Sequence, residues 1–152
     1  MLDNIVNDRE FANIMKKNIV EMIVHFFKKE QNFGILCKVE DASFNPELPS
    51  NINSSFSPLT LFFLAGYTFE TARIEENYLV FEAGFGEDNF GSIVSVPLLS
   101  IMQVIVDETP LLINLAVYKE EEFEPNEDID SKGVENSMAS FLSNPENSKF
   151  LK

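Results

Sequence analysis

The chain has 152 residues, 45% hydrophobic and 24% charged, which suffices for one hydrophobic core and is too short for two comfortable domains. Its 25 Asp and Glu against 11 Lys and Arg give a formal net charge of −14, which disfavours nucleic acid as a partner because phosphate backbones repel that charge. The single cysteine excludes an intrachain disulfide, and we expect neither a signal peptide nor a membrane span, so the expected location is cytoplasmic.

The first long segment has helical spacing. Its apolar residues recur at steps of three, four and five, which predicts an amphipathic helix over residues 8–30. Asn7 and Glu10 resemble a capping pair at its start, and residues 32–34 resemble a stop. The apolar side is wide, so it is either all core or partly the interface with a second subunit. The residues expected at such a dimer interface are Ile19, Met22, Ile23 and Phe26.

The next segments alternate in the manner of strands. Residues 35–39 predict a short strand, and the Asn, Ser and three prolines of residues 41–58 predict a long loop. Residues 59–69 and 78–86 are rich strand candidates, and residues 92–96 are a third.

The last part of the chain changes character twice. Residues 97–105 have apolar positions at helical spacing after a proline and predict a short helix, whereas residues 111–117 alternate and predict a strand. Seven carboxylates then fall within residues 120–130, with few apolar companions. The expected organisation is a mainly β domain of the α+β class over residues 1–118, followed by a mobile acidic tail over residues 119–152.

Residue types that support catalysis are scarce. His25 is the only histidine, which excludes a histidine-dependent triad or a multi-histidine metal site and leaves a surface or interface role. Cys37 alternates with apolar neighbours as a small core residue does, and the GxG of residues 84–86 lacks the third glycine of a phosphate loop. Glu82 could act only with a second carboxylate in a polar cleft, which the pattern does not predict. We therefore expect a binding module without enzyme activity, cofactor or metal.

Residues 81–117, FEAGFGEDNFGSIVSVPLLSIMQVIVDETPLLINLAV, resemble the central part of the stringent starvation protein B (SspB) family. The marks are an aromatic-glycine turn at Phe85-Gly86, the string VSVPL at residues 94–98, the apolar segment 101–105 and the acidic break at residues 107–108. The order of the other predicted elements also agrees. The resemblance implies a small SspB-like or Sm-like β-barrel that is closed by the N-terminal amphipathic helix and forms a homodimer.

The same resemblance implies a function. SspB-like proteins are adaptors that bind short C-terminal degradation tags such as the ssrA tag and deliver the tagged protein to the ClpXP protease. A tail links the body to the ClpX ATPase, and this acidic sequence would hold such a linker extended. The residues expected to dock on ClpX are Lys149, Phe150, Leu151 and Lys152, with the segment Met138–Leu142 as an alternative contact.

A peptide groove needs apolar strand backbone and small residues that let another chain approach. Residues 64–68 and 81–85 combine these properties and correspond in order to the strands that line the groove in the family. The alternative for Phe81 and Phe85 is an interior position. The acidic loop of residues 87–90 would favour tags that carry Lys or Arg. The expected lining residues are Leu64, Gly66, Tyr67, Thr68, Phe81, Ala83 and Phe85, with Phe90 at the rim.

A different function stays open. A small acidic dimeric chaperone for unfolded or secreted polypeptides would have similar size, charge and phenylalanine content. Such a chaperone would bind a long internal segment of its client and would need neither a free C-terminus in the client nor a terminal docking motif of its own.

Overall fold

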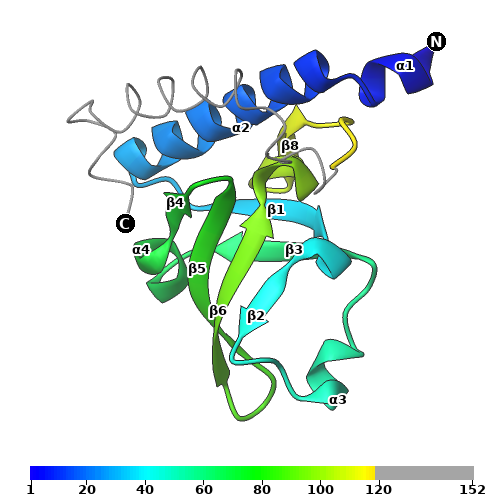
Figure 1. Ribbon diagram of the computed structural model, residues 1–152. Helices are drawn as coiled ribbons and strands as arrows, with labels where there is room; N and C mark the ends of the chain where they lie inside the picture. The colour runs from blue at the N-terminus through cyan, green and yellow to red at the C-terminus, as the bar shows by residue number, and fades with distance from the viewer. Residues whose placement is uncertain (119–152) are drawn as a thin grey trace.

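A computed structural model describes residues 1–118 of the chain. Two antiparallel sheets and a long N-terminal helix make up most of it (Figure 1). The helices are α1 (Leu2–Val6), α2 (Arg9–Lys29), α3 (Ser50–Asn53) and α4 (Tyr67–Thr71), with 3-10 turns η1 (Val39–Asp41) and η2 (Leu98–Ser100). The strands are β1 (Phe33–Lys38), β2 (Ser43–Asn45), β3 (Leu59–Leu64), β4 (Arg73–Glu75), β5 (Tyr78–Phe85), β6 (Phe90–Pro97), β7 (Ile101–Val106) and β8 (Thr109–Ile113).

Helix α2 confirms the prediction for residues 8–30. The Asp8 carboxylate caps it by accepting a hydrogen bond from the Phe11 N–H at 3.1 Å, so the cap lies one residue after the predicted Asn7. Lys28 and Lys29 lie in the last turn, where positive charge is favoured by the helix dipole. The helix ends at Glu30, whose φ of 53° lies in the left-handed region.

The strands pair in two separate sheets. Sheet A has the order β3-β1-β7-β8, and sheet B has the order β2-β6-β5-β4. Figure 1 shows α2 lying along one end of both sheets, while β2, β5 and β6 cross in front of β1 and β3. This is a mixed α+β architecture with two antiparallel sheets and an N-terminal helix, as the sequence predicts at the level of fold class.

The core lies between the inner faces of the two sheets and the apolar side of α2. Register places Phe33 opposite Leu64 in sheet A and Phe81 opposite Val94 in sheet B, and all four side chains are buried. Phe26 and Phe27 of α2 pack against the ring of Phe33, which joins the helix to sheet A. Lys16 Nζ donates to Asn77 Oδ1 at 2.6 Å and ties the helix to the β4–β5 turn, and burial lowers the pKa of this lysine.

The dimer interface predicted on α2 is wrong for its most buried members. Ile19 and Ile23 are 0% exposed and Phe26 is 7% exposed, because all three face the core of their own chain. Met22 is half-buried and packs against the same core. A side chain inside its own domain cannot contact a second subunit, so Ile19, Ile23 and Phe26 belong to the core of their own chain.

Several predicted boundaries also change. Residues 97–105 form no α-helix but the end of β6, the turn η2 and most of strand β7. The strand expected over residues 59–69 ends at Leu64, and the one expected over residues 111–117 ends at Ile113. The loop predicted for residues 41–58 contains strand β2 and helix α3.

Within residues 1–118, no helix combines the length and apolar character needed to cross a membrane. The tail predicted over residues 119–152, with its docking residues Lys149, Phe150, Leu151 and Lys152 and the alternative segment Met138–Leu142, lies outside the described residues.

Candidate peptide-binding edge

Two of the predicted groove residues face the interior. Leu64 on β3 and Phe81 on β5 are both 0% exposed. Each side chain lies on the inner face of its sheet, opposite Phe33 and Val94 respectively. The assignment of Leu64 and Phe81 to an exposed peptide groove is therefore wrong, and the alternative interior position is confirmed for Phe81.

Phe85 belongs to a cluster of phenylalanine rings contributed by β2, β3 and the loop before β3. Its ring centroid lies 5.8 Å from that of Phe44, 5.9 Å from that of Phe56 and 6.4 Å from that of Phe62. These are ordinary aromatic packing distances, so the ring is engaged by its own chain. Phe90 lies opposite Phe85 in the β5–β6 register and is half-buried. Phe85 is half-buried in this ring cluster, and its place in a peptide groove stays a prediction.

The predicted residues after Leu64 leave the sheet. Gly66 has φ +59° and ψ −130°, a conformation that favours glycine, and it directly precedes helix α4. Tyr67 and Thr68 accordingly lie in this short helix and not on a strand. The helix lies against β5, so it brings Tyr67 and Thr68 close to the strand that carries Ala83.

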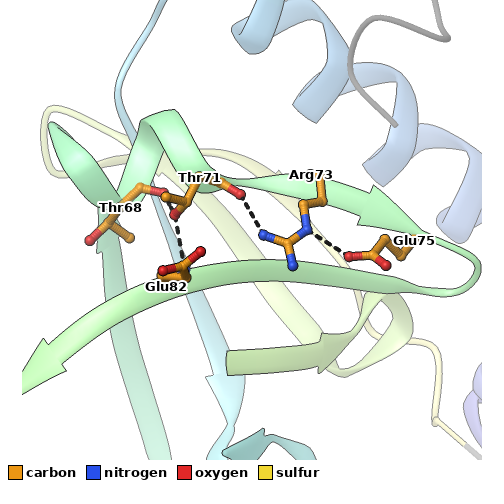
Figure 2. Close-up of polar contacts among 5 residues, drawn as sticks. All are labelled: Thr68, Thr71, Arg73, Glu75 and Glu82. Atoms are coloured by element: carbon orange, nitrogen blue, oxygen red, sulfur yellow. Dashed lines mark hydrogen bonds and ion pairs between the residues drawn. The ribbon is translucent and has the colours of Figure 1, made fainter. Parts of the chain in front are cut away.

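A chain of hydrogen bonds fastens α4 to β4 and β5 (Figure 2). The Thr71 hydroxyl accepts a hydrogen bond from the Glu82 N–H at 2.9 Å and donates to the Thr68 carbonyl at 3.1 Å. Arg73 donates through Nη1 to the Thr71 carbonyl at 3.0 Å and through Nε to Glu75 Oε2 at 2.6 Å. Thr71 thus replaces a neighbouring strand as the partner of the Glu82 amide.

The Tyr67 ring lies at the surface next to this cluster. Its hydroxyl donates to Glu82 Oε1 at 2.8 Å, and its side chain is 63% exposed. The hydrogen bond to Glu82 and the carboxylate's charge raise the pKa of Tyr67, because both stabilise the protonated phenol. The bond therefore orients an exposed aromatic ring beside β5.

Strand β5 continues beyond the end of its neighbour β4. Pairing with β4 covers only Tyr78–Val80, whereas pairing with β6 extends to Phe85. Because backbone groups alternate between the two edges of a strand, the N–H and C=O of Gly84 point to the same side as the Glu82 N–H. No strand within residues 1–118 pairs with this side of residues 82–85. We call residues 82–85, with Tyr67 and Thr71 beside them, the β5 edge.

The β5 edge carries small residues and is surrounded by negative charge. Ala83 is half-buried, and a Cβ added at Gly84 would overlap the side chain of Asn89, so the missing Cβ of Gly84 makes room for Asn89. Arg73, the basic residue of the neighbouring β4, is already paired with Glu75. The carboxylates on the flanking elements are Glu70, Glu75, Glu82, Glu87 and Asp88.

Replacing Thr71 with valine tests the link between α4 and β5. The substitution keeps the shape and leaves the Glu82 N–H without its acceptor, so we expect the free energy of unfolding to fall by about 1–2 kcal/mol. Chemical denaturation would measure it. The matched control is Thr60→Val, whose hydroxyl donates to the exposed Ser57 carbonyl, and it should cost about 0.5 kcal/mol or less. Equal losses for the two variants would contradict the assigned role of Thr71.

No protein-family model, curated protein or solved structure matches the chain. The site therefore rests on geometry alone. The contribution of Thr71 was not predicted from the sequence, since a lone threonine after an apolar run carries no signal for a contact eleven residues away. Glu82 accepts a hydrogen bond from the Tyr67 phenol, the contact that positions its carboxylate. Within the described residues, no group of three or more His, Cys, Asp or Glu side chains gathers as metal ligands would.

Proposed function

We propose that this protein is a non-enzymatic, SspB-like adaptor that binds short C-terminal degradation tags along the β5 edge. The observation that carries the proposal is the unpaired edge of β5 at residues 82–85, bordered by the exposed Tyr67 ring. An extended peptide gains main-chain hydrogen bonds at such an edge by adding as a further strand. In this proposal the β5 edge takes the place of the groove predicted from residues 64–68 and 81–85.

The peptide would use backbone groups of β5 that no strand within residues 1–118 pairs with. The Glu82 C=O and the Gly84 N–H and C=O offer a register of only three to four peptide residues, with about 1 kcal/mol net for each bond. The Tyr67 ring adds a rigid apolar contact, of the kind that dominates many interfaces. The surrounding carboxylates favour peptides with Lys or Arg and disfavour acidic ones.

The remaining parts of the proposal follow the resemblance to the SspB family. The two sheets would form the family's Sm-like barrel, and the tail would hand the captured substrate to the ClpX ATPase through Lys149–Lys152. We place the protein in the cytoplasm as a homodimer that acts without cofactor, nucleic acid or membrane. The acidic sequence after Tyr118 supports a tether, because a self-repelling linker sets a useful effective concentration for its end.

The alternative, a small acidic dimeric chaperone for unfolded or secreted polypeptides, is favoured by one observation. Leu61 and Phe63 on β3 are more than half exposed, and such apolar surface suits a holdase. A chaperone of this kind would bind internal segments regardless of the client's C-terminus.

Fluorescence anisotropy with labelled peptides separates the two functions. We expect saturable binding of ssrA-type and Lys- or Arg-bearing peptides with a free C-terminus, tighter than roughly 100 µM, which corresponds to about 5.5 kcal/mol. Methylating alternate backbone nitrogens of the peptide should weaken binding about tenfold or more at every second position, because only those amides face the β5 edge. Tolerance of methylation at all positions would contradict strand addition.

Variants at Tyr67 supply the matched control on the protein. Tyr67→Ala removes the ring and should weaken peptide binding about tenfold, whereas Tyr67→Phe keeps the ring and loses only the hydroxyl. We expect the phenylalanine variant to stay within about threefold of the wild type. Equal binding of the alanine variant and the wild type would remove Tyr67 from the site.

A further inference from the structure

The outer face of sheet A, which points away from the core, is apolar. Strand register places Leu61, Leu36, Gln103 and Ile113 in one row across β3, β1, β7 and β8. The next row holds Phe63, Gly34 and Ile105. We call these rows, with Leu59 on β3, Leu111 on β8 and Leu115 just after β8, the outer face. Its exposed large side chains, each 44–61% accessible, are Leu59, Leu61, Phe63, Leu111, Ile113 and Leu115.

The apolar area of the outer face is at the upper end of what a single chain normally exposes. With about 100 Å² for each half-exposed large side chain, these six residues present on the order of 600 Å² of apolar surface. That value is at the upper end for a monomer and approaches the roughly 800 Å² that each partner buries in a standard protein interface. The surface therefore has the area of a dimer contact.

The distribution of charge on the outer face favours one kind of binding partner. Within residues 1–118, no Asp or Glu lies in the rows of this face, whose polar members are Lys38 and Gln103. Two copies of so acidic a chain repel each other over most of their surface, and that repulsion is smallest where carboxylates are absent. A face free of carboxylates on an acidic chain favours a second copy of that chain.

The two ends of the face are complementary to each other. Lys38 lies at the end where β1 finishes, and Asp107 and Glu108 form the β7–β8 turn at the opposite end. Lys38 and Leu115 also line one hollow of about 80 Å³, so the residue just after β8 lies near the end of β1. A twofold axis that reverses the strand direction would bring Lys38 of each copy toward the acidic turn of the other.

Strand β3 gives an independent reason for a partner. It is an edge strand of sheet A, and its six residues, LTLFFL, include no charge and no proline. Exposed apolar edges of this kind lack the usual protection against association. We propose that the protein forms a homodimer in which the outer faces of two copies of sheet A pack against each other, with Lys38 near Glu108 of the second copy.

Sedimentation velocity of the full chain tests this interface. The wild type should sediment with twice the mass of one chain at micromolar concentration, and Leu61→Asp should raise the dimer dissociation constant at least 100-fold. The control is Ile14→Asp, which places the same charge at an equally exposed isoleucine on α2 and should leave the dimer intact. Circular dichroism would verify that both variants fold.

Charge reversal tests the proposed orientation of the twofold axis, which places Lys38 near Glu108 of the second copy. Lys38→Glu should weaken the dimer about tenfold, and adding Glu108→Lys to it should restore most of that loss. A monomeric wild type at 100 µM, or dissociation by Ile14→Asp but not by Leu61→Asp, would overturn the proposal. Capture of unfolded polypeptide by a monomeric wild type would instead assign the face to a client. Neither result bears on the β5 edge, which is measured by peptide binding.

Discussion

Replacing Ile23 with alanine is expected to lower the free energy of unfolding by about 3–4 kcal/mol. Ile23 is 0% exposed on the inner side of α2, so truncation removes buried methyl groups and leaves a cavity that the packed core cannot fill. Urea denaturation at low micromolar concentration would measure the loss.

The control for this experiment lies on the same helix. Ile14 is 57% exposed, and Ile14→Ala should change stability by less than about 0.5 kcal/mol, since alanine also has the higher helix propensity. If Ile23 instead lay at a subunit interface, its loss would depend on protein concentration. A concentration-dependent effect of Ile23→Ala, or equal effects at both positions, would restore the interface that the sequence suggested.

The thiol of Cys37 is expected to react with a disulfide reagent about a thousandfold more slowly in the folded chain than in the unfolded chain at pH 8. Burial, and then the charge of Asp41, raise the pKa of Cys37 to about 12 from 9.0, so the reactive thiolate is scarce. A spectrophotometric thiol assay with and without denaturant would measure the ratio. Rapid labelling of the native protein would show that β1 opens or that the thiol is not in the core.

The same shift makes stability depend on pH in the alkaline range. The pKa of Cys37 is higher in the folded state, so the unfolded state releases the proton first as pH rises. The stabilising contribution is complete below about pH 9 and is lost between about pH 9 and 12, by roughly 1.4 kcal/mol for each pH unit. The difference in stability between the wild type and Cys37→Ala should therefore shrink over that interval.

Elements whose apolar residues follow one clear period could be predicted from the sequence. Elements whose apolar residues fit both helical and strand periods could not. Helix α2 has a single apolar stripe, and its bounds agree within one residue. Residues 97–105 fit helical spacing equally well, yet they contain β-branched Ile101, Val104 and Ile105, which favour strand β7. A bulge in the β1–β7 pairing breaks the alternation that would have revealed that strand.

The candidate site was harder to predict because β3 is apolar on both faces. In LTLFFL, Leu61 and Phe63 point outward while Phe62 and Leu64 point into the core, and composition alone does not distinguish the two sets. Gly66 then turns the chain into α4, so Tyr67 reaches β5 from a helix. The open edge itself follows from β4 being three residues long, a length that no sequence pattern specified.

The buried side chain of Asn114 holds the chain in place just after strand β8. Its Nδ2 donates to the carbonyls of Leu99 at 3.1 Å and Ile101 at 2.9 Å, and its Oδ1 accepts from the Ala116 N–H at 2.9 Å. The Val117 N–H donates to the Val6 carbonyl nearby. A chain pulled from its C-terminal side would load the Val117–Val6 bond first, then the bonds of Asn114, and only then strand β8, so sheet A would open last.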